Sequence, residues 1–292
     1  MSDQSDHTCA EDITALVVAS FDGCDDPRLR DVLQSLVRHL HAFAVEMGLT
    51  ETELMEAVQF LTRTGQRCSD SRQEFILLSD TLGLSMVVDV VNHRRGASAT
   101  ESTVLGPFYV ADSPWRSNGD LLTADLTSEP LLVRGQVRDA SGQPLQGAIV
   151  DVWQNAANML YAVQDPGQPA GNLRGRFRAD SDGRFWFLTI RPVDYPIPDD
   201  GPVGDMLSAT GRHPWRPAHI HVIVSAPGHR PLTTHIFDAD SPHLGSDAVF
   251  AVKKSLIRRL QRHEPDDELT PAGVRGPWFT VDCDIVLETD GG

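Results

Sequence analysis

The sequence predicts an α+β protein in which a helical N-terminal region precedes a mostly antiparallel β-sandwich. Through the first hundred residues, apolar side chains recur at three- and four-residue steps, as they do along one face of a helix. After a small, polar stretch at residues 94–102, this pattern gives way to short alternating segments separated by Gly, Pro and Asp. Regularly spaced short strands are typical of a β-sandwich. We therefore predict a helical domain at residues 1–102 and a β-sandwich domain at residues 103–292.

Three helix starts are visible in the first region. Residues 25–27, Asp-Asp-Pro, have the pattern of a capped start with proline in the first turn. The apolar residues that follow keep helical spacing: Leu29, Leu33, Leu36, Val37, Leu40 and Phe43. A capping box, in which Ser or Thr is followed three residues later by Glu, begins at Thr50 and again at Ser71. The last helix is expected to run unbroken through residues 77–86 toward residue 93.

The sandwich region contains three predicted strand–turn–strand units and a closing strand. The paired segments are residues 131–139 with 148–154, 176–179 with 184–189, and 220–225 with 232–237. Helical spacing returns at residues 247–262, and the closing strand is expected at residues 279–287. The connection at residues 191–217, rich in Pro, Asp and Gly, is too long for a plain loop in a compact domain, so we expect it to carry function.

Composition narrows the functional classes. The chain has 292 residues and 40% hydrophobic content, enough for a sizeable core. Its net charge of -16 would repel polyanions, so we expect neither nucleic-acid nor membrane binding. The four cysteines are scattered without CxxC spacing, which argues against a zinc ribbon or a disulfide scaffold. With no signal-like or membrane-spanning pattern visible, we expect a reduced, cytoplasmic setting.

Residues 212–222 read Arg-His-Pro-Trp-Arg-Pro-Ala-His-Ile-His-Val and contain a candidate metal site. Side chains alternate along a strand, so His219 and His221 would share one face. Tyrosine has a pKa of about 10 and becomes a ligand at neutral pH only beside a strongly polarising cation such as ferric iron. The spacing alone also leaves open zinc, copper and cupin-type sites, or two purely structural histidines.

Five stretches of the chain resemble the intradiol ring-cleaving dioxygenases, and within them the members that act on hydroxyquinol. They are residues 103–109 (TVLGPFY), 151–154 (DVWQ), 173–177 (LRGRF), 192–204 (PVDYPIPDDGPVG) and 211–221 (GRHPWRPAHIH). The resemblance implies a mononuclear non-haem Fe(III), one per subunit, bound by Tyr161, Tyr195, His219 and His221.

The resemblance also implies catalytic roles. A catecholic substrate would bind the iron through both oxygens and displace the axial tyrosine, by position Tyr195, which would take up a substrate proton. Arg216 matches the active-site arginine of the family and would stabilise negative charge on the substrate ring. The alternative for Arg216 is an ion pair with the acidic residues Asp199 and Asp200.

The substrate pocket follows from the same resemblance. Its implied residues are Leu77, Asp80, Val104, Leu105, Gly106, Pro107, Phe108, Arg216, His235, Phe250 and Ala251, with the last pair expected on a helix. Catechol-specific relatives typically have proline where Asp80 stands. We hypothesise that Asp80 accepts a hydrogen bond from a third ring hydroxyl and so selects hydroxyquinol (1,2,4-trihydroxybenzene) over catechol. The alternative is an Asp80 that faces solvent or caps a turn.

The chain departs from the family at one place. Where the family usually has Gly-x-Tyr-Asp around its first tyrosine ligand, residues 159–162 read Met-Leu-Tyr-Ala. This departure leaves a bulkier or otherwise substituted diol open as the substrate.

The sequence thus predicts cleavage of hydroxyquinol by O2 to 3-hydroxy-cis,cis-muconate, which tautomerises to maleylacetate. Catechol, a chlorocatechol or another substituted diol remain alternatives. A hypothesis from a different class is a non-catalytic, transthyretin-like binding module, which residues 132–152 also resemble. By analogy with the family, the helical region is expected to form a homodimer interface, with a bound lipid there as a further expectation.

Overall fold

The computed structural model describes residues 8–290, apart from residues 70–71, 94–95, 97, 125–127, 266–270 and 272–273. The predicted capping box at Ser71 lies outside the described residues. The chain forms two compact units, residues 1–63 and residues 64–292. The predicted division into domains after residue 102 stays a prediction.

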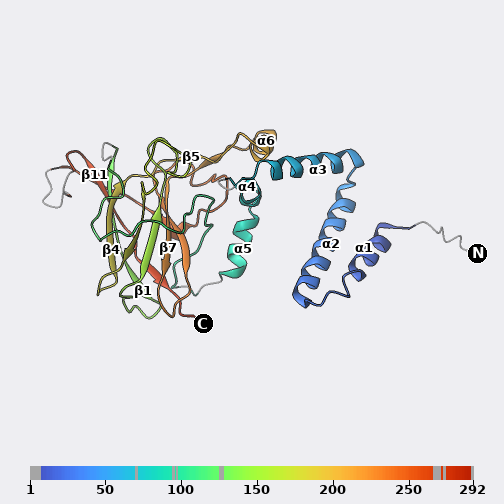
Figure 1. The fold of residues 1–292 in the computed structure, drawn as a ribbon, viewed down its shortest axis with the longest axis horizontal. Coiled ribbons are helices and arrows are strands. Elements are labelled where there is room, and N and C mark those ends of the chain that lie inside the picture. Colours follow the sequence, from blue (N-terminus) through green and yellow to red (C-terminus); the bar gives the residue numbers. More distant parts are fainter. Residues whose placement is uncertain are drawn as a thin grey trace, which may run out of the picture. The chain divides into compact units, whose positions relative to one another are not determined.

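The first unit consists of α1 (Ala10–Ala19), α2 (Pro27–Met47) and most of α3 (Glu51–Gln66), shown in blue in Figure 1. The predicted start of α2 is confirmed, because the Asp26 carboxylate accepts hydrogen bonds from the backbone N–H groups of Arg28 (2.9 Å) and Leu29 (3.1 Å).

The capping box before α3 is also confirmed. The Thr50 backbone N–H donates to the Glu53 carboxylate at 2.9 Å, and the Glu53 N–H donates to the Thr50 hydroxyl at 3.2 Å. Helix α1 is not among the predicted helix starts; at its N-terminus the Cys9 backbone N–H donates to the Asp12 carboxylate at 3.0 Å.

The second unit begins with two short helices, α4 (Glu74–Thr81) and α5 (Leu84–Asn92). The prediction of one unbroken helix here is wrong, because Gly83 adopts a left-handed conformation with φ of 74° and ends the first helix. A further helix, α6 (Pro202–Ala209), lies within the long connection. Among the described residues, no helix combines the length and apolar character needed to cross a membrane.

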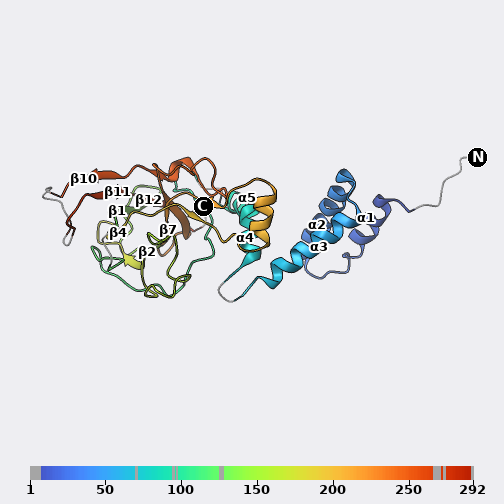
Figure 2. The same ribbon diagram turned by 90° about the horizontal axis from the view of Figure 1, so that it is seen from above.

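Two sheets form the sandwich, and Figure 2 shows β11, β1 and β4 in one layer and β2 and β7 in the other. The first sheet contains β10 (Gln261–His263), β11 (Trp278–Asp282), β1 (Pro130–Asp139), β12 (Ile285–Leu287) and β4 (Arg184–Ile190). The second has the order β3 (Arg174–Arg178), β2 (Ile149–Trp153), β7 (His219–Ser225), β8 (Leu232–Asp238) and β9 (Ile257–Arg258). The α+β class is confirmed, and the sheets are mixed: β1 runs parallel to β11 and β12, and β8 runs parallel to β9.

Strict alternation along the strands builds the core between the two sheets. In β2, Val150 and Val152 point inward, and in β7 Ile220, Val222 and Val224 do so; all five belong to the buried hydrophobic cluster. The residues between them, including His219 and His221, therefore lie on the outer face of the second sheet. Helices α4, α5 and α6 stand beside that face in both ribbon views.

The predicted helix at residues 247–262 is wrong. Only a short 3-10 turn, η1 (Lys254–Leu256), is helical there; a loop at residues 247–253 precedes it, and the short strands β9 and β10 follow it. The Asp247 carboxylate accepts the backbone N–H groups of Val249 (3.3 Å) and Ala251 (3.0 Å), and Phe250 has φ of 59°. Because these donors turn to a side chain, they cannot form the i to i−4 ladder of a helix.

Two other connections differ in detail from the prediction. The closing strand at residues 279–287 is split into β11 and β12. The long connection at residues 191–217 carries α6 and a two-stranded ribbon of β5 (Tyr195–Pro196) and β6 (Trp215–Arg216). That ribbon positions two of the predicted site residues.

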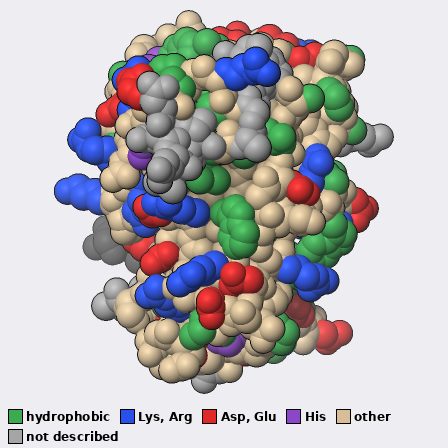
Figure 3. All heavy atoms as spheres, turned by 90° about the vertical axis from the view of Figure 1, so that its left-hand side faces the viewer, with side chains coloured by type: hydrophobic (Ala, Val, Ile, Leu, Met, Phe, Trp, Pro, Cys, Tyr) green, Lys and Arg blue, Asp and Glu red, His purple; other side chains and the backbone are tan. Residues whose placement is uncertain are grey.

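The sandwich face drawn in Figure 3 carries basic and acidic side chains close together, with apolar ones scattered between them. Arg134 in β1 and Asp282 in β11 form an ion pair at 2.5 Å, and both side chains are about half exposed. Exposed pairs of this kind contribute about 0–1 kcal/mol each, so they favour solubility more than stability.

Candidate metal centre

One row of side chains crosses four strands of the second sheet on its outer face. Arg174 lies opposite Trp153, Trp153 opposite His221, and His221 opposite His235 in the strand register. All four are almost fully buried, with at most 2% of each residue exposed. The sheet therefore holds two imidazoles of the predicted site side by side on a rigid surface.

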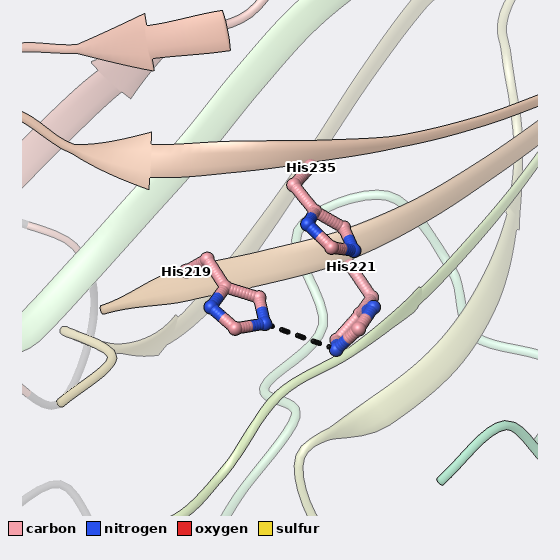
Figure 4. A group of neighbouring side chains, drawn as sticks. All are labelled: His219, His221 and His235. Carbon is pink, nitrogen blue, oxygen red and sulfur yellow. Dashed lines mark hydrogen bonds between the residues drawn. The ribbon is translucent and has the colours of Figure 1, made fainter. Parts of the chain in front are cut away.

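His219 and His221 converge as predicted. Their Nε2 atoms lie 3.1 Å apart, and Figure 4 shows the two rings facing each other. The Nδ1–H of His219 donates to the Pro217 carbonyl at 2.6 Å, which leaves the lone pair on Nε2 free for a metal ion. Trp153 stacks on His221 with ring centroids 4.7 Å apart. A Cβ on Gly106 would lie 3.1 Å from the His221 ring, so only glycine leaves the ring room.

Both predicted tyrosines reach the same point. The Tyr161 hydroxyl lies 3.1 Å from Nε2 of His221, and the Tyr161 and Tyr195 rings are 5.4 Å apart. Tyr161 follows β2 in a loop, whereas Tyr195 lies in β5 directly opposite Arg216 in β6. Tyr109, the remaining tyrosine, packs against Trp153 instead.

The electrostatics match a metal site with two anionic and two neutral ligands. Burial, together with Arg216 nearby, lowers the pKa of His219 well below its usual value, and burial and His219 do the same to the pKa of His221. Both imidazoles are therefore neutral at pH 7, as metal ligands must be. Burial and Tyr195 raise the pKa of Tyr161 well above that of free tyrosine, so its phenol ionises only when a cation compensates the charge.

Arg216 lies beside these ligands and is charged. Its Nη1 lies 3.3 Å from the Tyr195 hydroxyl, and its guanidinium pairs with the Asp247 carboxylate at 3.1 Å. Burial opposes its charge, but Asp247 outweighs burial and raises the pKa of Arg216. The alternative ion pair of Arg216 with the acidic residues at 199–200 is not formed. Arg216 pairs with Asp247 instead, and Asp200 pairs with Arg67 and Arg72.

The predicted pocket residues differ in their exposure to solvent. Leu77, Asp80, Val104, Phe108, His235 and Ala251 are buried. Leu105 and Phe250 are 42% and 54% exposed, and Phe250 lines a cavity of about 490 Å³ together with Asp247 and Ala248. Pro107 is partly buried.

Among the buried pocket residues, Phe108 and His235 adjoin the predicted metal ligands, whereas Asp80 lies within electrostatic reach of Arg216. Phe108 stacks on Tyr161 with centroids 4.5 Å apart. Asp80 comes from α4, and burial raises the pKa of its carboxyl while Ser85 and Arg216 oppose that rise. Asp80 is only 4% exposed, so it does not face solvent; its carboxyl has a hydrogen bond with Ser85 in the first turn of α5, a contact of the kind that the capping alternative predicts.

Residues 104–287 match the family model described as Dioxygenase, and residues 26–100 match the model described as Catechol dioxygenase N terminus. The chain belongs to the intradiol dioxygenase family. It is 50% identical to the hydroxyquinol 1,2-dioxygenase of Rhizobium sp. strain MTP-10005 over 93% of this chain and 92% of that protein. It is 47% identical to the 6-chlorohydroxyquinol 1,2-dioxygenase of Cupriavidus pinatubonensis, over 84% of this chain and 89% of the relative.

A solved structure agrees with these relatives. The hydroxyquinol 1,2-dioxygenase of Pseudomonas putida DLL-E4 superimposes with a TM-score of 0.90 at 49% identity, covering 96% of this chain and 99% of that one. As a member of this enzyme family, the chain is a ring-cleaving dioxygenase, and the idea of a non-catalytic binding module is not needed to explain its sandwich.

Sequence reasoning missed three residues that adjoin the intradiol dioxygenase site. Asp247 fixes Arg216, Trp153 supports His221, and Arg174 donates to the Phe108 carbonyl at 3.4 Å. Strand alternation could have found Trp153 and Arg174, because they share a face with the paired histidines. Asp247 could not have been found in this way, because it lies in a loop and not on a strand. The helical spacing of residues 247–262 had predicted a helix there.

The departure from the family at Met159 has a structural cost. Met159 has φ of 70°, a left-handed conformation that suits glycine, the residue usual there in intradiol dioxygenases. We expect Met159→Gly to raise the free energy of unfolding by about 1 kcal/mol, because it removes backbone strain beside Tyr161. Urea denaturation of the two proteins would measure this difference. Met159→Ala is the control, since alanine keeps the strain, and equal effects of the two changes would contradict the explanation.

Proposed function

We propose that the chain is an Fe(III)-dependent intradiol dioxygenase that cleaves hydroxyquinol with O2, giving 3-hydroxy-cis,cis-muconate and then maleylacetate. The convergence of two tyrosines and two neutral histidines carries the proposal. Two phenolates favour ferric over ferrous iron, because anionic oxygen ligands prefer the harder, more charged ion. Tyr161, Tyr195, His219 and His221 would hold one iron per subunit.

The bound iron would make a chelated diol reactive toward O2 without an external reductant. Tyr195 is placed to accept a proton from a substrate hydroxyl, because its own hydroxyl lies at the metal site and beside Arg216. Arg216, fixed by Asp247, would stabilise negative charge that develops on the substrate. The stacked rings of Phe108 and Tyr161 would exclude water from one side of the site.

The choice of hydroxyquinol is supported by Asp80 and by the names of the relatives. Asp80 is a buried acceptor within electrostatic reach of Arg216; its carboxyl has a hydrogen bond with Ser85, and its remaining acceptor capacity could take a hydrogen bond from a third ring hydroxyl. Relatives named for hydroxyquinol and 6-chlorohydroxyquinol both align over most of the chain. Chlorinated hydroxyquinols are therefore the second candidate, ahead of catechol and chlorocatechols.

Colour and oxygen consumption test the proposal. Tyrosinate-to-Fe(III) charge transfer should make the iron-loaded protein wine-red, and oxygen uptake should be fastest with hydroxyquinol among hydroxyquinol, 6-chlorohydroxyquinol, catechol, chlorocatechols and protocatechuate. Tyr161→Phe is the matched control and should lose most of the colour. A colourless protein that is fully folded and iron-free after loading would refute the ferric site, whereas faster uptake with catechol would refute only the substrate.

We further propose that the N-terminal helices form a homodimer interface. Apolar side chains on α2 and α3 are about half exposed, including Leu36, Leu40, Phe43, Leu54, Val58 and Leu61. A groove of about 650 Å³ between α1 and α2, lined in part by Ala15, Val18 and Val45, would suit a lipid chain.

The proposed dimer interface can be tested by mutation. Leu40→Glu should convert a dimer into monomers in analytical ultracentrifugation. Glu46→Gln, on the same helix, should leave the dimer intact, and a Leu40→Glu protein that stays dimeric would place the interface elsewhere.

The proposed domains and location follow the same reasoning. If residues 103–292 are the catalytic domain, then α4, which carries Leu77 and Asp80, contributes to its site from the N-terminal side. A cytoplasmic location is supported by the four cysteines, all of which are free thiols.

A further inference from the structure

His235 is a third imidazole beside the two histidine ligands, and the ferric site does not use it. It is 2% exposed and lies directly opposite His221 in the register of β7 and β8. Neither of its ring nitrogens makes a hydrogen bond of regular geometry in the described part of the chain, although the Val104 backbone lies beside the ring. The Val104 backbone can engage only one of the two ring nitrogens, so at least one nitrogen of this buried imidazole has no partner among the described residues. Such a nitrogen is costly to bury, which makes His235 a candidate metal ligand.

The three histidines are close enough to share one ion. A ligand nitrogen from each of His219, His221 and His235 lies within 4.8 Å of the other two. The His235 ring centroid lies 4.6 Å from that of His219 and 4.2 Å from that of His221, and Figure 4 shows the three rings grouped on neighbouring strands. The His219 and His235 rings are stacked with an interplanar angle of 23°, so the His235 side chain would have to rotate for the three nitrogens to lie about 2.0–2.1 Å from a common zinc ion.

The chemistry of three imidazoles differs from that of the ferric ligand set. Three neutral nitrogens with an open fourth position suit Zn²⁺, Co²⁺ or Cu²⁺, which do not need anionic oxygen ligands. Binding such an ion requires no proton to leave Tyr161 or Tyr195. Ferric iron, in contrast, depends on both phenolates.

We propose that His219, His221 and His235 form a binding site for a divalent transition-metal ion, with zinc as the reference ion, which shares two ligands with the ferric site. Because both ions use His219 and His221, they exclude each other. The competition between the two ions rests on the proposed ferric function. The binding of zinc to the iron-free protein does not depend on that function. Zinc-loaded enzyme would be colourless and inactive.

Zinc titration of the full-length, iron-free protein, followed by calorimetry, tests the site. We expect one Zn²⁺ per chain, and we expect His235→Gln to weaken binding at least tenfold, because glutamine fills similar space without an imidazole nitrogen. With Co²⁺ as the probe, the strong visible absorption of a tetrahedral site should fall in the same variant. His229→Gln, which changes a partly buried histidine in the turn between β7 and β8, should bind zinc like the wild type.

Two comparisons separate this site from the ferric one. Tyr161→Phe should keep its zinc affinity while losing the ferric charge-transfer colour, and His235→Gln should bind iron with wild-type colour. The proposal is overturned if the wild-type protein binds no zinc, if His235→Gln binds it unchanged, or if Tyr161→Phe loses as much zinc affinity as His235→Gln. A wild-type protein that binds zinc but never turns red would instead refute the ferric function and leave the three-histidine site standing.

Discussion

Replacing Arg216 with glutamine is expected to lower kcat by about 10²–10³-fold, the loss typical of removing one preorganised group that stabilises transition-state charge. The guanidinium lies 3.3 Å from Tyr195 and 3.4 Å from His219, so it faces the position where a metal-bound substrate would react. Oxygen uptake at saturating hydroxyquinol measures kcat directly. The iron content of the variant must be measured in parallel, so that loss of metal is not mistaken for loss of catalysis.

Asp247 complicates this experiment and also provides its control. Without Arg216, the buried Asp247 carboxylate loses its counter-charge, and breaking a buried pair in this way costs about 3–5 kcal/mol. In the double variant Arg216→Gln with Asp247→Asn, both charges are gone, so much of the lost stability should return while kcat stays low. If the double variant recovered kcat together with stability, Arg216 would be a structural residue only.

The predictable part of this protein is the part that strand alternation governs. His219-x-His221 share a face because Ile220 must enter the core, and this requirement can be read from three residues. The same rule places Trp153 and Arg174 on that face. Capping signals likewise located α2 and α3, because the bonds that define them span only three residues.

The features that the sequence did not predict depend on contacts between residues that are distant in the chain, or on single residues that interrupt a helical pattern. The loop around Asp247 takes its shape from a carboxylate that binds backbone N–H groups and a distant arginine at once. Gly83 ends α4 within an otherwise helical pattern. Tyr161 and Tyr195 could be tied to the histidines only through resemblance to a family, since nothing near them in the sequence points to a metal.

Backbone strain is concentrated around the same site. The non-glycine residues with positive φ in the described chain are Met159, Leu173 and Phe250. Met159 lies two residues before Tyr161, Leu173 directly before Arg174, and Phe250 directly before Ala251. Such conformations cost of the order of 1–3 kcal/mol each and persist where the surrounding structure requires them. Here each one holds a loop that supplies or supports a residue of the site.

Replacing Asp80 with alanine is expected to lower the preference for hydroxyquinol over catechol, expressed as the ratio of kcat/KM values, by about 10- to 100-fold. A hydrogen bond to a charged group contributes about 1.5–3 kcal/mol, which is the discrimination that the third hydroxyl would lose. Catechol turnover should hold, because catechol has no third hydroxyl to bind the Asp80 carboxylate. Asp80→Asn keeps an acceptor without the charge and should fall between the two.

The pH dependence of the preference provides a second measurement. Because burial raises the pKa of Asp80 above its usual value, its carboxyl takes up a proton at a higher pH than a free aspartate does. The ionised carboxylate is the stronger acceptor, so the preference for hydroxyquinol should grow as pH rises through that pKa, and Asp80→Ala should abolish this component of the profile. An unchanged preference in a folded, iron-loaded Asp80→Ala protein would show that specificity lies elsewhere in the pocket, and the buried residues Leu77 and Val104 would then be the next to replace.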